Sequence, residues 1–161
     1  MCPLDGPGRG PTKPFLTDLL ACTSHVLTQG FAKVLRERGV SLPVWRVMAA
    51  LLARPGETVS GLAETCLLQQ PTMTKLLDRM ARDGLVARSH DPRDRRVVQI
   101  ILTPAGQARA AELTAESARY EAEVLARHPQ AEGIKPVLRD IIAQSSRHAL
   151  DGVHGQDEEG A

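Results

Sequence analysis

A proline directly after two glutamines, at Gln69-Gln70-Pro71, interrupts one helical pattern of apolar residues and starts another. Proline lacks the backbone N–H that a continuing helix would use, but it fits the first turn of a new helix. Two helices are therefore expected to meet at an angle here. The second helix is predicted to end at Gly84 and to carry one apolar face with i, i+3, i+4, i+7 spacing, formed by Met73, Leu76, Leu77 and Met80.

The opposite face of this second helix is polar and basic. Most helices with charged residues outside and apolar residues inside are simply solvated, so this face alone identifies no partner. The residues on or beside it are Pro71, Thr72, Thr74, Lys75, Asp78, Arg79 and Arg82.

A β-hairpin with a charged tip is predicted after this helix. Residues 85–88 and 97–102 are rich in β-branched and apolar residues, and a polar turn that contains proline separates them. Its tip gathers Arg93, Arg95 and Arg96. Such a cluster is costly to hold together unless neighbouring carboxylates offset it, as Asp91 and Asp94 can, or a polyanion binds it.

A short helix, a tight junction, a polar helix and an arginine-tipped hairpin follow one another in the order of a winged helix-turn-helix. This order favours duplex DNA as the partner. Aromatic residues make up only 2% of the chain, too few for the stacking platforms that grip single strands. The side chains that can hydrogen-bond to base edges or phosphates are Gln70, Thr72, Thr74 and Lys75. The arginines of the hairpin tip suit a narrow minor groove.

Amphipathic helices are expected on both sides of this central part. Their apolar faces are broader than a winged-helix core requires, which favours a self-association surface. Pro14 is expected at the first position of the first helix, Gly39 at its end, and Ser41, Ser60 and Thr103 as N-caps. We expect a disordered tail over 1–13, a single domain over 14–150 with a DNA-binding lobe over 41–104 and dimerisation helices over 14–39 and 104–150, and a disordered acidic tail over 151–161.

Several classes of protein are disfavoured by composition. No apolar run approaches the roughly 20 residues of a membrane span, and residues 1–14 hold four prolines and three glycines where a signal peptide would be apolar, so the expected location is the cytoplasm. The three cysteines match no disulfide framework or metal pair, and the five histidines are scattered. We expect no metal, no cofactor, no membrane partner and no catalytic activity, because no nucleophile elbow or Gly-rich loop occurs.

The segment from Gly84 to Gly106 resembles the wing signature of the MarR family of bacterial transcription regulators, with its GL-V run, DP-DRR tip and LT--G ending. Residues 42–48 and 71–80 extend the resemblance. It implies a homodimeric repressor that presents two winged helices to a palindromic operator, through interlocked first and last helices. It also implies that Asp94 holds Arg96 in place for the minor groove.

The resemblance further implies an effector, often an aromatic acid or phenol, which releases the repressor from DNA. His25 and Thr28 on the first helix and Trp45 and Arg46 on the second are the candidate ligand residues, although each has an ordinary structural alternative. A redox sensor that uses cysteine is the alternative within the same fold. Cys22 and Cys66 lie on apolar stripes and are expected to be small core residues. A winged helix that serves only protein interaction is a more remote alternative.

Overall fold

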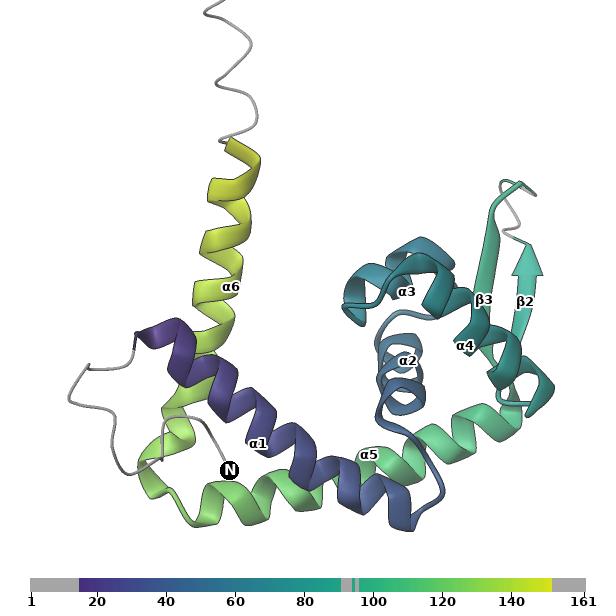
Figure 1. Cartoon of the computed structure of the whole chain (residues 1–161). Helices are drawn as coiled ribbons and strands as arrows, with labels where there is room; N and C mark the ends of the chain where they lie inside the picture. The colour runs from purple at the N-terminus through teal and green to yellow at the C-terminus, as the bar shows by residue number, and fades with distance from the viewer. Residues whose placement is uncertain (1–14, 91–93, 95, 152–161) are drawn as a thin grey trace, which may run out of the picture. The chain divides into compact units, whose positions relative to one another are not determined.

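The computed structural model describes residues 15–90, 94 and 96–151 (Figure 1). The described chain is mainly helical with a small antiparallel sheet, which confirms the expected fold class. It divides between Ala118 and Arg119 into two compact units, and α5 contributes to both. The elements are α1 (Leu16–Glu37), α2 (Leu42–Ala53), β1 (Glu57–Thr58), α3 (Val59–Thr65), α4 (Gln70–Arg82), β2 (Val86–His90), β3 (Val98–Leu102), α5 (Pro104–Ala126), the 3₁₀ turn η1 (Pro129–Gly133) and α6 (Ile134–Asp151).

The core of the first unit lies where α2, α3 and α4 meet the sheet, a cluster that is visible in Figure 1. The predicted apolar face of α4 is buried in full, and Met73 and Met80 have no exposed surface. Burial of such a side chain contributes about 1.5–3 kcal/mol, so this face holds α4 in position. The largest fully buried side chains are Leu35, Val47, Met48, Leu51, Leu62, Met73, Leu77, Met80, Ile100 and Leu113.

The sheet has three strands in the order β1-β3-β2, and all its pairs are antiparallel. The predicted hairpin is present, with Val86 opposite Leu102 and His90 opposite Val98. The short β1 adds to the other edge of β3, with Glu57 opposite Ile100. Local sequence does not identify this strand, because its hydrogen-bonding partner lies some forty residues further along the chain.

Two helix starts differ from the prediction, and a third, at Ser41, has the predicted N-cap residue. The first helix begins at Leu16, with the Asp18 carboxylate accepting from the N–H of Phe15 at 3.2 Å; Pro14 lies outside the described residues. Ser41 occupies the N-cap of α2 without a side-chain cap bond. Thr58 rather than Ser60 caps α3, and its hydroxyl accepts from the N–H of Gly61 at 3.1 Å.

The start of α5 is tied closely to the segment that leads into β2. The Thr103 hydroxyl caps α5 as predicted by accepting from the N–H of Gly106 at 3.0 Å, and it donates to the Gly84 carbonyl at 2.5 Å. The N–H of Thr103 binds the Leu85 carbonyl at 3.1 Å. A Cβ on Gly106 would overlap that same carbonyl oxygen. The LT--G ending therefore docks α5 against the base of the wing.

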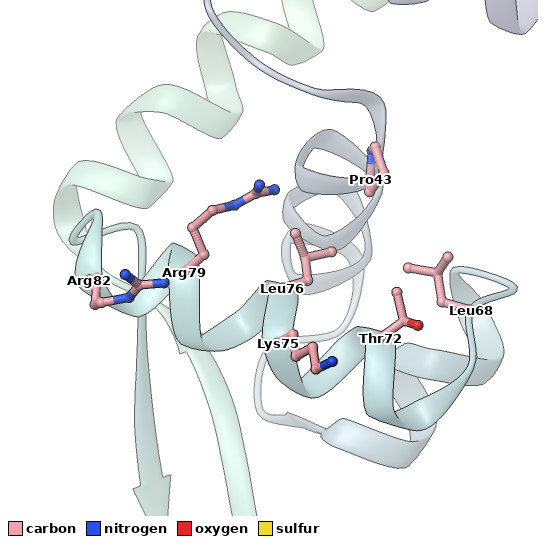
Figure 2. Close-up of a pocket in the computed structure, with 7 residues that line it drawn as sticks. All are labelled: Pro43, Leu68, Thr72, Lys75, Leu76, Arg79 and Arg82. Carbon is pink, nitrogen blue, oxygen red and sulfur yellow. The ribbon is translucent and has the colours of Figure 1, made fainter.

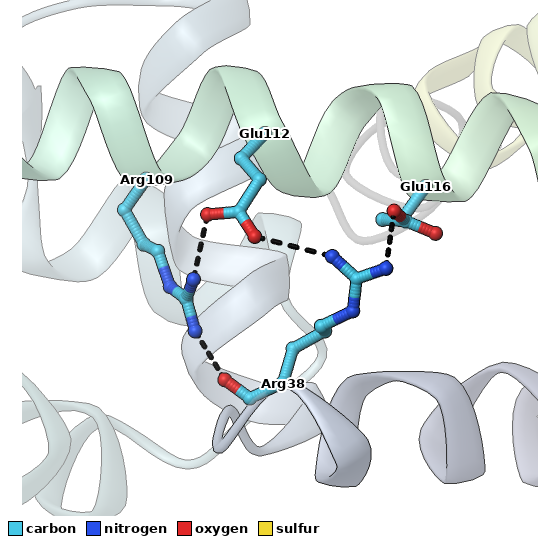
Figure 3. A network of polar contacts seen from close by, with 4 residues as sticks. All are labelled: Arg38, Arg109, Glu112 and Glu116. Atoms are coloured by element: carbon cyan, nitrogen blue, oxygen red, sulfur yellow. Dashed lines mark hydrogen bonds and ion pairs between the residues drawn. The ribbon is translucent and has the colours of Figure 1, made fainter.

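Figure 3 shows a network of two arginines and two glutamates that joins the end of α1 to α5. Arg38 binds Glu112 at 3.3 Å and the buried Glu116 at 2.6 Å. Arg109 binds Glu112 at 2.6 Å and donates to the Arg38 carbonyl. The Arg109 hydrogen bond is the main reason that the pKa of Glu112 is lowered, so the stability from this carboxylate is present at neutral pH and is lost as pH falls through the lowered pKa.

Replacement of Arg38 by methionine is expected to lower the free energy of unfolding by about 1–2 kcal/mol, because Glu116 loses its ion-pair partner while the apolar stem is kept. This figure is discounted from that of a fully buried pair, since the Arg38 side chain is 38% exposed. Urea unfolding at constant protein concentration measures it. The exposed Arg36 on the same helix provides the control in Arg36→Met, and equal stability of the two variants would show that the network is not stabilising.

The second unit comprises the end of α5, η1 and α6. Lys135 on α6 pairs with Glu121 on α5. Large apolar side chains of α6 remain exposed, among them Ile142 at 65%. Both predicted tails lie outside the described residues, apart from Asp151 at the end of α6. None of the described helices is long and apolar enough to cross a membrane.

Candidate DNA interface

The turn between α3 and α4 brings the two helices together at the predicted junction. α3 ends at Thr65, and the chain reverses through Leu67, which adopts a left-handed φ of 56°. The N–H of Leu68 closes this turn by donating to the Ala63 carbonyl at 2.8 Å. Gln69 is the N-cap of α4, and Pro71 lies in its first turn, so proline starts the helix as predicted.

The polar face of α4 is exposed along its whole length. Lys75, Arg79 and Arg82 border an open groove, as does Thr72 (Figure 2). Three cations on successive turns of one helix provide the positive potential that a phosphate backbone attracts. The predicted polar face of α4 is therefore present, and within the described chain no apolar side chains cover it.

Two of the residues predicted to contact DNA, Gln70 and Thr74, also form hydrogen bonds within the helix-turn-helix. The Gln70 amide donates to the Ser60 hydroxyl at 3.1 Å and thereby links the starts of α3 and α4. The Thr74 hydroxyl donates to the Gln70 carbonyl at 3.1 Å, and its side chain is half-buried. Thr72 is exposed on the groove, so it is better placed than Thr74 to meet a base edge.

An ion pair that sequence patterns did not reveal connects the wing to α4. Arg88 on β2 binds Asp78 on α4 at 2.6 Å. Both side chains are about half exposed, so the pair contributes little stability by itself. It does join the two elements predicted to contact DNA. Asp78 was assigned to the polar face, but no local spacing identifies a partner on a different element.

Asp94 and Arg96 form the pair that the family resemblance implied. The Asp94 carboxylate accepts from the backbone N–H of Arg96 at 3.0 Å and from its Nε and Nη2 at 3.2 and 3.4 Å. These bonds, the backbone one first, lower the pKa of Asp94, so the carboxylate is charged at neutral pH. The Arg96 side chain is nevertheless 92% exposed. It is thus oriented and accessible, whereas Arg93 and Arg95 lie outside the described residues.

Two of the four predicted ligand residues line a described pocket. Trp45 and Arg46 line a pocket between α2 and the end of α3, and the residues that line it include neither His25 nor Thr28 of α1. His25 is exposed and Thr28 is half-buried. Trp45 instead meets α1 through Phe31, with ring centroids 6.0 Å apart in an edge-to-face arrangement. The spacing along α1 could not show which of its faces meets α2.

The cysteines differ from one another. Cys66 is buried as expected, and burial raises the pKa of its thiol, with Arg46 opposing the rise. A raised pKa keeps the thiol protonated and weakly nucleophilic. Cys22 is only half-buried and is disulfide-bonded, so the expectation that it is a small core residue is wrong. Over the described ranges, no group of three or more potential metal ligands occurs.

A helix-turn-helix with an exposed basic second helix, followed by a hairpin with an oriented arginine at its tip, defines a winged helix-turn-helix DNA-binding protein. Residues 38–97 match the MarR family model. The chain belongs to the MarR family of transcription regulators, which is a family of DNA-binding repressors and regulators and not of enzymes.

Comparison with individual proteins supports this assignment. The structure of a MarR family transcriptional regulator from Silicibacter pomeroyi is similar with a TM-score of 0.74 and 32% identity, over 84% of this chain and 98% of that one. The homoprotocatechuate degradative operon repressor of Escherichia coli is 28% identical over 80% of this chain and 87% of its own length. A transcriptional repressor of Pseudomonas putida is 32% identical over 49% of this chain, and the chain spans about half of that relative's length, 47%.

A third similar protein is a MarR family protein of Mycobacterium tuberculosis whose structure was determined in complex with salicylic acid. It is 27% identical, with a TM-score of 0.69, over 81% of this chain and 98% of that one.

Proposed function

We propose that this chain is a homodimeric repressor that binds a palindromic operator in duplex DNA and is released by a small aromatic acid or phenol. The observation that carries the DNA-binding part is the pairing of an exposed basic face on α4 with the Asp94–Arg96 arrangement on the wing. The α4 residues that would contact the major groove or its flanking phosphates are Gln70, Pro71, Thr72, Thr74, Lys75 and Arg79. On the wing, Asp94 would hold Arg96 in the minor groove, and Arg93 and Arg95 would lie nearer the DNA backbone or the tip of the wing.

Exposed apolar side chains on α1 and α6 support the homodimer. Phe15 is 77% exposed and Leu16 59%, and α6 exposes Val137 and Ile142 by more than half. Exposed apolar surface along two helices indicates an interface that a second copy of the chain would cover. Sedimentation equilibrium is expected to give a mass of twice the 17.4 kDa of one chain. A single-chain mass at micromolar concentration would contradict the dimer.

Relatives support an aromatic effector. One similar protein was solved with salicylic acid, and another is named for the homoprotocatechuate degradative operon, whose name refers to an aromatic acid. In this chain Trp45 offers a flat apolar wall and Arg46 a fork for a carboxylate. His25 and Thr28 on α1 are the further candidate ligand residues.

A gel shift with the DNA upstream of the protein's own gene tests the proposed function. We expect a discrete protein–DNA complex on the gel. An excess of random duplex should displace little of the operator, and a higher salt concentration should weaken the complex. Parallel lanes with dithiothreitol test the redox alternative, which the disulfide at Cys22 favours. Operator affinity that changes with reductant and becomes insensitive in Cys22→Ser would support that alternative over the aromatic effector. Absence of any complex would leave the protein-interaction alternative.

Two substitutions on α4 are expected to differ in kind. Lys75→Gln should weaken binding to operator and random duplex alike, because it removes a phosphate contact, and the salt slope should fall by about 0.9 for each such contact. Thr72→Val keeps the side-chain shape and should weaken only the operator complex, by about 1–3 kcal/mol at one base pair. Binding isotherms on both duplexes measure this. Parallel losses on both duplexes for the two variants would place sequence recognition elsewhere.

A further inference from the structure

The end of α1 and α5 hold each other through reciprocal polar contacts (Figure 3). Arg38, the C-cap of α1, binds Glu112 at 3.3 Å and the buried Glu116 at 2.6 Å, both on α5. In return, Arg109 of α5 donates to the Arg38 carbonyl and binds Glu112 at 2.6 Å. The last carbonyls of a helix have no partner within it, so the Arg109 guanidinium completes the end of α1. These four residues form the α1–α5 network.

The same part of α5 is fixed to the base of the wing. The Thr103 hydroxyl donates to the Gly84 carbonyl at 2.5 Å. Gly106 approaches the Leu85 carbonyl so closely that a Cβ would overlap its oxygen. Gly106 and Glu112 lie about 9 Å apart along the helix axis, at about 1.5 Å per residue. One short stretch of helix therefore connects the wing to the end of α1.

The other described connections between α1 and the DNA-binding lobe are less directional. The covalent link passes through Gly39, whose φ is 69° and where a Cβ would meet no atom within 4 Å. Phe31 and Leu35 of α1 are buried, and Phe31 packs against Trp45 of α2. Apolar burial is non-directional, whereas an arginine–carboxylate pair fixes both a distance and an angle. The α1–α5 network is therefore well suited to fix the direction of the lobe on α1.

α1 also carries apolar surface that the proposed dimer would cover. Phe15, Leu16, Leu19 and Val26 are exposed, from 46% for Leu19 to 77% for Phe15. They precede or occupy the first half of the helix, and the network begins at its C-cap. One helix would thus meet the partner chain at one end and the DNA-binding lobe at the other. In a symmetric dimer, a change in the angle between α1 and the lobe moves the two α4 helices relative to each other.

We propose that the α1–α5 network fixes the direction of each DNA-binding lobe on α1 and thereby sets the half-site spacing that the dimer accepts. Two recognition helices bind half-sites about 34–36 Å apart, or about 10–10.5 bp, so one base pair shifts a half-site by about 3.4 Å and turns it by about 35°. The four residues are positioning residues, since all lie outside α4 and the wing. The inference rests on the proposed function for the dimer and its operator.

Operators with one base pair inserted or deleted between the half-sites test this role, once footprinting has located the operator. The wild type is expected to bind each altered operator at least about tenfold more weakly than the native one. Arg38→Met and Glu112→Gln should bind the native operator more weakly and should bring that ratio to within about threefold, because a loosely directed lobe adapts to other spacings.

Glu112→Gln keeps this test decisive. The Glu112 side chain is 44% exposed and glutamine keeps its shape, so this variant should fold even if Arg38→Met does not. Arg36→Met removes a cation from α1 outside the network and should keep the wild-type ratio. A purely structural role would lower affinity for all three operators by one factor, because fewer folded molecules bind each of them alike. That result, or a wild-type ratio in Glu112→Gln, overturns the proposal while DNA binding stands.

A distance measurement without DNA tests the same network independently. Asp83 is the exposed C-cap of α4, so a nitroxide-bearing amino acid at this position on both protomers reports the separation of the two α4 helices by pulsed electron–electron double resonance. The wild-type dimer should give one narrow distribution of distances, and Arg38→Met and Glu112→Gln a broader one. Equal distributions overturn the proposal, as does a single-chain mass, which leaves no pair of lobes. If the wild type binds no duplex, the proposed function fails, and the distance distributions still decide whether the network fixes the lobes.

Discussion

Arg96→Ala is expected to lower operator affinity by about tenfold for each wing, or about 100-fold for a dimer that uses both. The side chain is 92% exposed and contributes little to the fold, so the loss should appear in DNA binding and not in stability. The log–log salt slope should also fall by about 0.9 for each phosphate that the wing no longer binds. Binding isotherms over a series of salt concentrations measure both quantities.

Two further variants sharpen this experiment. Asp94→Asn keeps the size of the side chain that holds Arg96 but removes its charge, so it should weaken binding in the same direction and by less than Arg96→Ala. Arg36→Ala removes an exposed cation from α1 and should leave affinity nearly unchanged. If Arg96→Ala bound the operator with wild-type affinity and slope, the wing would not contact DNA.

Gly106→Ala is expected to destabilise the fold by about 3 kcal/mol or more, because the added methyl would overlap the Leu85 carbonyl oxygen and backbone cannot yield cheaply. The strain would fall on the joint that Thr103 makes with Gly84 and Leu85, so the start of α5 would separate from the base of the wing. Urea unfolding followed by circular dichroism, at one protein concentration throughout, measures the change.

Gly133→Ala is the matched control for this substitution. A Cβ at Gly133 would meet no atom within 4 Å, so its effect should stay within about 0.5 kcal/mol. Similar unfolding midpoints for the two variants would contradict a close contact between α5 and the Leu85 carbonyl. Reduced operator affinity in Gly106→Ala, at temperatures where it remains folded, would further show that this joint positions the wing.

Local patterns predicted the parts of the interface whose partners are close in sequence. The apolar face of α4 follows from the i, i+3, i+4, i+7 spacing, and all four of its residues are buried. The Thr103 cap involves a group three residues away. The Asp94–Arg96 pair, which the family resemblance implied, spans two residues. In each case the interaction is set by helix or turn geometry, which a short stretch of sequence specifies. The two helix starts that differed, those of α1 and α3, by contrast, depend on small shifts at helix ends.

Contacts between distant segments were decided only by tertiary structure. Arg38 and Glu112 are 74 positions apart, and neither residue type nor spacing identifies the other as a partner. From the sequence alone, Gly106 is only a residue with low helix propensity. The close approach of the Leu85 carbonyl, which leaves no room for a Cβ, explains why glycine is at this position. The pairing of β1 with β3, and the pocket that Arg46 shares with the end of α3, likewise depend on how the elements pack. The amino-acid sequence thus determined the elements and their exposed chemistry, because these depend on periodicity over a few residues. Packing decided which side chains meet, because that depends on shape complementarity across the whole core.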